Sequence, residues 1–255
     1  RDIITAVIAE GVGNVFSALK QIFGEEIIQI QVIKRTQLDA LVLEEAAYSM
    51  ALRDKFIPGV TYIAATFPSV RPDDILAVVN AAMKGWFTGW AELLRFEGKL
   101  ERVTGHAYVR ACNSGSSASL LAMAAACERN QSKSVITTAL SFPTTVAPIY
   151  QNNRIPYYID INVETLEPVY DQIWEILSDR VNHNQIAGIV LTHMLGFPYK
   201  ESAVRDILSY YPDSVFFIAD ICDALGARVD GHSVGALADL SVLSFFPAHH
   251  ITTGE

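Results

Sequence analysis

From about residue 106 onward, short apolar runs alternate with helical stretches, and this alternation constrains the fold more than any other feature of the sequence. The runs expected to form strands are Ala107–Cys112, Val135–Leu140, Tyr157–Ile161, Gly188–His193, Phe216–Ile221 and Leu240–Phe245. The helical stretches between them are Ser117–Glu128, Thr145–Gln151, Val169–Arg180 and Ser202–Tyr210. Near-continuous apolar strands are typical of parallel strands that are covered on both faces. The pattern therefore predicts an α/β fold with a mostly parallel, doubly wound sheet.

The first part of the chain lacks this regular alternation. We expect residues 1–55 to form an N-terminal helical segment, in which the apolar run Ile27–Ile33 is open to either helix or strand. Phe56-Ile57-Pro58-Gly59 predicts a turn, and there we place the boundary to a large domain, residues 56–255. Pro72-Asp73-Asp74 predicts the start of a further helix, because proline and acidic residues favour the first helical turn.

Composition and charge exclude several classes of partner. The net charge is −9 and no block of Lys and Arg occurs, so we expect neither a nucleic-acid nor a membrane partner. Cys112, Cys127 and Cys222 lie far apart without CxxC spacing, which predicts buried free thiols in a reducing, cytoplasmic compartment. The lack of CxxC and HExxH spacing also argues against a metal site. Both ends of the sequence are abrupt, and we expect a fragment of a longer chain.

Polar residues follow several predicted strands, where open α/β sheets bind their ligands. Gly115 and Ser116 precede a helix, whose N-terminal amides suit a phosphate, although an ordinary serine cap is the alternative. Asp220 ends a buried strand and needs a partner, which a protonated heterocycle or a structural hydrogen bond would provide. His249 and His250 follow the last strand, where a packed or capping histidine is the alternative to a functional one.

Taken together, these segments resemble the DegT/StrS family of pyridoxal-phosphate sugar aminotransferases and dehydratases. That family has a phosphate-binding loop, a ring-stacking aromatic residue, an acid at the pyridine nitrogen and a Ser-Phe-x-Pro-x-Lys segment. The matching positions here are Gly115 and Ser116, Phe142, Asp220, and Ser244. The resemblance implies the large domain of a fold-type-I transferase, with the family's small C-terminal domain missing. It also implies pyridoxal phosphate or pyridoxamine phosphate as the cofactor.

The departure from the family pattern is His249, which stands where the cofactor lysine is usual. No lysine follows Lys200 in the sequence, so the usual covalent link to the cofactor cannot form there. Because of this histidine and the segment Cys222-Asp223-Ala224-Leu225-Gly226, the sequence resembles one subgroup of the family. This subgroup is the CDP-4-keto-6-deoxyglucose 3-dehydrases of lipopolysaccharide deoxysugar biosynthesis. The resemblance implies pyridoxamine-phosphate-dependent loss of the C3 hydroxyl from a nucleotide-linked 4-keto-6-deoxyhexose.

The resemblance also implies a role for each site residue. His249 is the catalytic base, and Asp220 pairs with the pyridine nitrogen. The other predicted cofactor contacts are Phe142 over the ring, Gly115, Ser116 and Ser244 at the phosphate, and Asp223, where aminotransferases of the family often have glutamine.

Two other functions remain open. A GDP-4-keto-6-deoxymannose 3-dehydratase shares the histidine, and a non-catalytic protein that binds cofactor or sugar would need no base. As partners, the resemblance implies a nucleotide-sugar substrate, a second copy of the chain in a homodimer, and an iron–sulfur flavoprotein reductase. In the CDP subgroup the cluster cysteines lie in the missing C-terminal part, so no cysteine of this sequence is assigned to an iron–sulfur cluster.

Overall fold

Two compact units make up the chain. They are residues 1–64 with 69–88, and residues 65–68 with 89–255. Within them, the computed structural model describes residues 4–9, 28–33, 35–53, 56–62, 70–179, 185–211 and 215–253. All residues predicted to carry chemistry lie in the second unit.

The second unit is built around five parallel strands. In spatial order they are β4 (Ile155–Ile159), β3 (Ser134–Thr138), β5 (Ile186–Thr192), β6 (Phe216–Asp220) and β9 (Leu240–Val242). Every neighbouring pair in this sheet is parallel. The central strands β3, β5 and β6 are almost wholly buried, as their apolar and β-branched sequences require. Five of the six predicted strands and the parallel α/β fold are thus confirmed.

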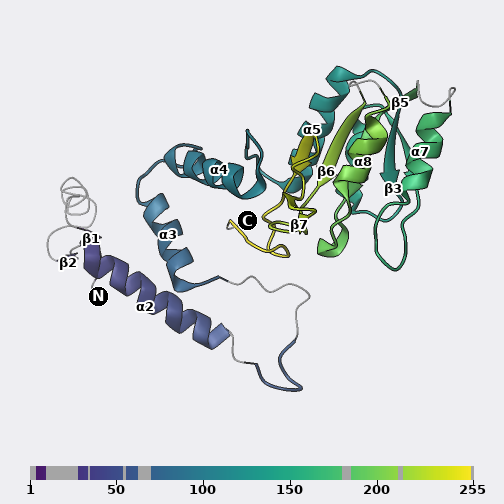
Figure 1. Cartoon of the computed structure of the whole chain (residues 1–255). Coiled ribbons are helices and arrows are strands. Elements are labelled where there is room, and N and C mark those ends of the chain that lie inside the picture. The colour runs from purple at the N-terminus through teal and green to yellow at the C-terminus, as the bar shows by residue number, and fades with distance from the viewer. Residues whose placement is uncertain are drawn as a thin grey trace. The chain divides into compact units, whose positions relative to one another are not determined.

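Helices cover both faces of this sheet (Figure 1). They are α5 (Gly115–Arg129), α6 (Pro143–Gln151), α7 (Tyr170–Ser178) and α8 (Glu201–Leu208). The first two pack against each other, and so do the last two. Successive strand residues point to opposite faces, so Phe216 packs in the core beside Met123 of α5, whereas Phe217 packs in the core beside Ile173 of α7. The four predicted helices are confirmed, and the sheet is doubly wound.

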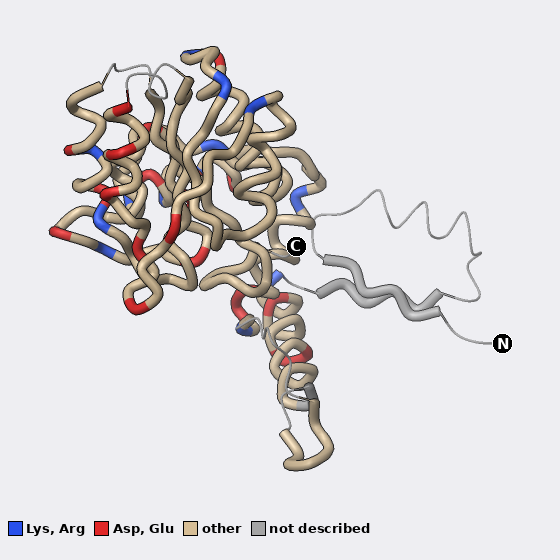
Figure 2. Tube along the Cα trace, turned by 90° about the vertical axis from the view of Figure 1, so that its right-hand side faces the viewer, with Lys and Arg blue, Asp and Glu red and all other residues tan. Residues whose placement is uncertain are grey.

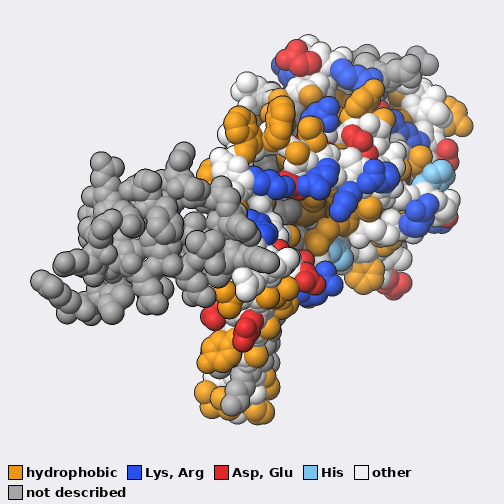
Figure 3. Space-filling model, turned by 90° about the vertical axis from the view of Figure 1, so that its left-hand side faces the viewer, with side chains coloured by type: hydrophobic (Ala, Val, Ile, Leu, Met, Phe, Trp, Pro, Cys, Tyr) orange, Lys and Arg blue, Asp and Glu red, His pale blue; other side chains and the backbone are white. Residues whose placement is uncertain are grey.

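Charged residues lie mainly on the helices and loops (Figure 2). Asp220, at the end of β6, is the single Asp, Glu, Lys or Arg in the five strands of the sheet. On the face shown in Figure 3, Lys and Arg side chains of this unit form a band, although the net charge of the sequence is −9. Asp220 is thus an acid inside an otherwise uncharged sheet, and a buried carboxylate needs hydrogen-bond donors or a cation as partners.

The predicted strand Ala107–Cys112 is wrong. This segment follows α4 (Ala91–Thr104) and is not part of a described strand. One oxygen of the buried Glu97 carboxylate accepts a hydrogen bond from the N–H of Ala111 (2.9 Å), and Arg110 lies 3.6 Å from the other. The side chain of a neighbouring helix thus satisfies a backbone donor that a strand would have paired with its neighbour.

The described part of the first unit contains strands as well as helices. β1 (Ile4–Ala9) and β2 (Ile28–Ile33) pair in parallel, and α2 (Arg35–Arg53) packs with α3 (Pro72–Ala82). The helical prediction for residues 1–55 is wrong at β1, whose sequence ITAVIA is rich in β-branched residues, and the open alternative at β2 is resolved as a strand. The helix predicted from Pro72 is confirmed. The domain boundary at residue 56 remains a prediction.

The turn predicted at Phe56-Ile57-Pro58-Gly59 is present, with Gly59 at φ 76°. The cysteines are free thiols, but only Cys127 is fully buried, and Cys112 is exposed because its segment is not a core strand. Among the described residues, no helix is both long enough and apolar enough to span a bilayer.

Candidate functional site at the carboxyl end of the sheet

Asp220 lies buried at the carboxyl end of β6, with 6% of its surface exposed. Its Oδ2 accepts a hydrogen bond of 2.6 Å from the hydroxyl of Thr145, in the first turn of α6. Its Oδ1 accepts one of 3.2 Å from the backbone N–H of Cys222. Two donors therefore orient the carboxylate, and each oxygen keeps a second lone pair that can accept from a bound cation or a protonated ring nitrogen.

Gly115 and Ser244 meet beside this end of the sheet. Gly115 is the first residue of α5, and Ser244 follows β9. A Cβ atom added at Gly115 would lie 2.7 Å from Cβ and 2.9 Å from Oγ of Ser244, so only glycine permits this approach. Ser114 caps the helix by accepting from the N–H of Ser117 (3.2 Å), which confirms the serine cap without excluding a ligand at the remaining amides. The result is a narrow cradle of a hydroxyl and helix N-terminal amides, which suits a phosphate.

His249 and Asp223 form a hydrogen-bonded pair. Nδ1 of His249 lies 2.9 Å from Oδ1 of Asp223, although the residues are 26 positions apart in the sequence. The backbone N–H of His249 donates to the carbonyl of Phe246 (2.9 Å), which closes a turn, and the Phe246 ring lies edge-on to the imidazole at 6.4 Å. The imidazole is thus held by its backbone and by one of its two ring nitrogens.

Two predicted site residues stand apart from these pairs. Phe142 immediately precedes α6, with 65% of its surface exposed, and Ser116 is exposed in the first turn of α5. The structure therefore brings Asp220 together with Thr145, Gly115 with Ser244, and His249 with Asp223. Phe142 and Ser116 each lie at the N-terminus of a helix, and their side chains are exposed and accessible to a ligand.

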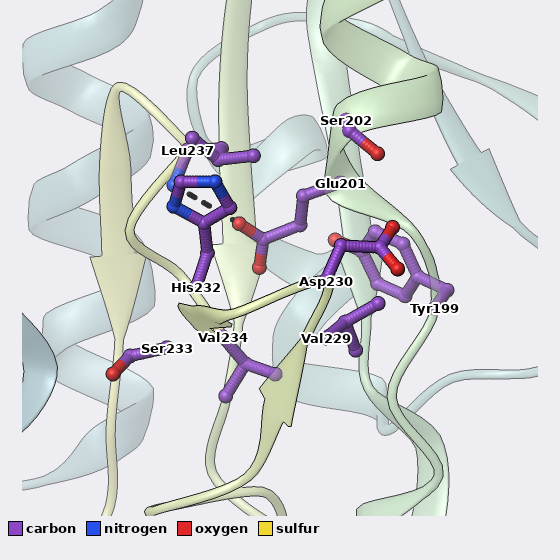
Figure 4. Close-up of a pocket in the computed structure, with 9 residues that line it drawn as sticks. All are labelled: Tyr199, Glu201, Ser202, Val229, Asp230, His232, Ser233, Val234 and Leu237. Atoms are coloured by element: carbon purple, nitrogen blue, oxygen red, sulfur yellow. Dashed lines mark hydrogen bonds between the residues drawn. The ribbon is translucent and has the colours of Figure 1, made fainter.

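A second histidine–carboxylate pair, which the sequence did not reveal, lies at the end of β5. His193 is fully buried, its Nε2 lies 2.8 Å from Oε1 of Glu201, and its ring stacks on Tyr199 at 3.9 Å. The backbone N–H of Tyr199 donates to Nδ1 of His193 (3.2 Å), so Nδ1 carries no proton and Nε2 is the donor to Glu201. Glu201 also accepts from the N–H groups of Gly235 and Leu237, the latter at 3.1 Å (Figure 4).

The environment of Glu201 stabilises its charged form. Burial opposes ionisation, but the hydrogen bond from His193 and those from the Gly235 and Leu237 amides outweigh it and hold the pKa of this carboxyl below its ordinary value. Figure 4 shows Glu201 directed from the start of α8 toward Leu237, beside a small hollow that Tyr199 also lines. No sequence motif marked Glu201, because its partners come from two separate loops.

The chemistry of the other titratable groups at this end is limited. Burial raises the pKa of the Cys222 thiol, and the charge of Asp220 raises it further, so Cys222 remains a neutral thiol. Within the described ranges, no group of three or more His, Cys, Asp or Glu side chains is arranged to hold a metal ion. The three pairs Asp220–Thr145, Gly115–Ser244 and His249–Asp223 are the predicted site residues that the structure brings into contact at this end.

Comparisons with known proteins relate this arrangement to a family. The model of the DegT/DnrJ/EryC1/StrS aminotransferase family matches residues 68–255. The chain is 33% identical over 228 residues to lipopolysaccharide biosynthesis protein RfbH of Salmonella typhimurium, a match that covers 87% of this chain and 50% of that protein. It is 33% identical over 207 residues to dTDP-4-dehydro-2,6-dideoxy-D-glucose 3-dehydratase of Saccharopolyspora spinosa, covering 78% and 43%. The chain thus spans about half the length of the curated relatives it matches.

Solved structures show the same fold. E. coli GDP-4-keto-6-deoxy-D-mannose-3-dehydratase with bound hydrated PLP aligns with a TM-score of 0.68 at 22% identity. The alignment covers 76% of this chain and 49% of the E. coli chain. This likeness confirms the fold-type-I α/β architecture that the sequence predicted.

Proposed function

This chain belongs to the DegT/DnrJ/EryC1/StrS aminotransferase family, and from that premise we propose that it forms the cofactor-binding part of a nucleotide-sugar 3-dehydratase. The proposed substrate is a nucleotide-linked 4-keto-6-deoxyhexose, which loses its C3 hydroxyl. The names of two relatives, a dTDP-sugar 3-dehydratase and a GDP-sugar 3-dehydratase, support this class of reaction. The nucleotide, CDP or GDP, is the finer part of the proposal.

The observation that carries the proposal is the imidazole at position 249. It follows β9 on the same segment as Ser244, and no lysine follows Lys200 in the sequence. An imidazole has no primary amine and cannot make the covalent link that a lysine would make, but it titrates near neutral pH and can accept a proton. A family member with an imidazole at this position is therefore suited to proton removal and not to covalent attachment of the cofactor.

The residues present fit a phosphorylated pyridine cofactor. The cradle between Gly115 and Ser244, which a Cβ would fill, offers a hydroxyl and helix N-terminal amides to a phosphate. Asp220 offers a buried, oriented carboxylate to a protonated ring nitrogen, and the exposed ring of Phe142 can cover a flat ligand. When bound, pyridoxamine phosphate would supply the amine that engages the sugar ketone and a ring that accepts electron density.

Each residue then has a distinct task in the proposal. Asp220 holds the proton on the pyridine nitrogen by charge pairing, and Thr145 keeps that carboxylate oriented. With the cofactor bound, His249 would accept a proton through Nε2 and could pass it to the departing C3 hydroxyl. The proton and the hydroxyl leave together as one water, so this step balances without an external reductant. The homodimer and the iron–sulfur flavoprotein reductase are further proposals for the whole protein.

The test is a single-turnover reaction with the complete protein. Pyridoxamine phosphate is supplied with either CDP-4-keto-6-deoxyglucose or GDP-4-keto-6-deoxymannose, and loss of the C3 hydroxyl is followed by mass spectrometry and NMR. We expect loss of the C3 hydroxyl from at least one of the two sugars, in addition to any water released when the amine engages the ketone, and the faster sugar identifies the nucleotide. Cofactor binding without loss of water from either sugar would instead support a binding protein. Amino transfer to C4 faster than loss of the C3 hydroxyl would support an aminotransferase.

A further inference from the structure

The bond between His249 and Asp223 limits where the imidazole can carry its protons. An ionised carboxylate can only accept, so the ring nitrogen that faces it, Nδ1, must be the one that bears hydrogen. The neutral imidazole then has a bare Nε2. This nitrogen is the only basic atom that the ring can offer to another molecule.

Asp223 is itself fixed by the strand that carries Asp220. It lies in the turn that follows β6, where the N–H of Ala224 donates to the carbonyl of Ile221 (3.0 Å). On the neighbouring loop Gly196 has φ 81°, and a Cβ there would lie 2.9 Å from the carbonyl oxygen of Asp223. The carboxylate of Asp223 therefore extends from a backbone that is held on two sides.

The degree of exposure argues that this pair does more than stabilise the fold. The side chains of His249 and Asp223 are 18% and 37% exposed, so their hydrogen bond is partly accessible to solvent. Solvent screens a partly exposed pair, which therefore contributes little to stability. The bond nevertheless connects the loops after β6 and β9, the two strands that deliver the buried acid and the predicted base.

We infer that Asp223 is a positioning residue, which holds His249 in the tautomer with hydrogen on Nδ1 and leaves Nε2 bare to take a proton. The inference rests on the proposed function and refines it, since the family resemblance had assigned Asp223 to the cofactor. Asp223 touches neither substrate nor reacting atoms in this role. It acts through the imidazole, as a carboxylate does in a hydrolase triad.

The tautomer can be measured directly, without cofactor or sugar. The complete protein is labelled with 15N-histidine, and long-range 1H–15N correlation spectra are recorded at pH 8, above the ordinary histidine pKa of about 6.5. His249→Asn identifies the signals of His249 by their loss. His193 is an internal reference, because its contacts fix the opposite tautomer, with hydrogen on Nε2.

We expect His249 to carry hydrogen on Nδ1 in the wild type and in Asp223→Glu, which keeps a carboxylate. In Asp223→Ala the form with hydrogen on Nε2 should become populated, while the His193 signals stay unchanged. Asp206→Asn, on the exposed side of α8, is the matched control and should leave both rings unaltered. Hydrogen on Nε2 of His249 in the wild type would overturn the inference without any variant, and so would an unchanged tautomer in Asp223→Ala.

Turnover provides the second measurement. Asp223→Ala should lower kcat about 10- to 100-fold, because misplacing a base costs less than the roughly 10²–10⁴-fold of losing it. KM should change less than about threefold, because the cofactor and sugar contacts remain. A large rise in KM at unchanged kcat would return Asp223 to a binding role. If the protein did not dehydrate either sugar but Asp223→Ala still shifted the tautomer of His249, the proposed function would be contradicted. The role of Asp223 in fixing the tautomer of His249 would still hold.

Discussion

The second unit contains two histidine–carboxylate pairs of nearly equal length in opposite surroundings. In the first, His193 and Glu201 are 0% and 5% exposed and lie 2.8 Å apart, and both imidazole nitrogens have partners. In the second, His249 and Asp223 lie 2.9 Å apart with partly exposed side chains, and one ring nitrogen is engaged. The same two functional groups therefore occur in different surroundings, and the distance between them does not distinguish the two pairs.

The difference lies in what each ring has left to offer. His193 accepts at Nδ1 and donates at Nε2, so it has no lone pair for a ligand and closes a network that joins β5, α8 and the loop before β9. His249 keeps its second nitrogen. A buried histidine with two protein partners is thus structural, whereas a partly open one with a single partner is available for chemistry.

Losing the open imidazole should have the largest effect. His249→Asn removes the proposed base, and we expect the loss of the C3 hydroxyl to slow about 10²–10⁴-fold. The free energy of unfolding should change by less than about 0.5 kcal/mol, because the side chain is not part of the core.

Single-turnover kinetics and urea unfolding measure these two quantities, with His250→Asn as the neighbouring exposed control. Equal rates in His249→Asn and the control would remove His249 from the mechanism. His249→Lys extends the comparison, since a primary amine at this position should favour transfer of an amino group over loss of the hydroxyl.

Breaking the buried pair should act on stability instead. Glu201→Ala leaves the Nε2–H of His193 and the amides of Gly235 and Leu237 without their acceptor. Each buried donor left without its acceptor typically costs about 1–3 kcal/mol, so with three such donors we expect a loss of at least about 3 kcal/mol. Urea denaturation followed by circular dichroism measures the effect, with the exposed Glu175→Ala of α7 as control. A loss below about 1 kcal/mol would mean that solvent replaces Glu201 and that this pair is not the structural one.

Thr145→Val tests the buried hydrogen bond that orients Asp220 in the candidate site. The substitution keeps the shape of the side chain and removes the donor to Oδ2 of Asp220. A buried acceptor left without its partner costs about 1–3 kcal/mol, so we expect a loss of stability in that range together with weaker cofactor binding. Thr144→Val, one position earlier in α6, is the control. Unchanged unfolding and unchanged cofactor affinity would show that Thr145 does not orient Asp220.

Much of the fold could be predicted from local sequence, because a strand covered on both faces must be apolar along its length. The runs around Val135, Gly188 and Phe216 are of this kind, and each forms a central strand. Ala107–Cys112 is also mostly apolar, with Arg110 as the exception, but it forms no strand, since its neighbour is a helix whose Glu97 accepts from a backbone N–H. A local sequence pattern shows whether a segment is apolar, but it does not show which element will pack beside that segment.

The sequence allowed candidate residues to be named one by one, but it did not show which of them would lie together. Gly115, Asp220 and His249 could be singled out because each lies beside the end of a predicted element, and Ser244 could be named through the family resemblance. The bond from Thr145 to Asp220 spans 75 positions. It depends on the strand order β4-β3-β5-β6-β9, which no local pattern contains.

The smallest expected effect is on the acid stability of the buried network. The pKa of Glu201 lies below its ordinary value, so its contribution is full above the unfolded value of about 4.3 and is lost as the pH falls through the folded value. Burial lowers the pKa of His106, whose Nε2 lies 2.7 Å from Oγ of Ser241. The unfolded state therefore takes up this proton first, below about pH 6.5, and folding is disfavoured as the solution becomes more acidic.

Both groups thus make the free energy of unfolding fall with decreasing pH, and they act in different windows. His106→Asn should flatten the fall in the window that opens below about pH 6.5, by less than the 1.36 kcal/mol per pH unit of one full proton because His106 is only partly buried. Below that window the fall should remain, since it belongs to Glu201. Urea unfolding at half-unit pH steps measures the slope, with the exposed His232→Asn as control. An identical slope in His106→Asn and the control would show that the buried network ends at Glu201 and does not include His106.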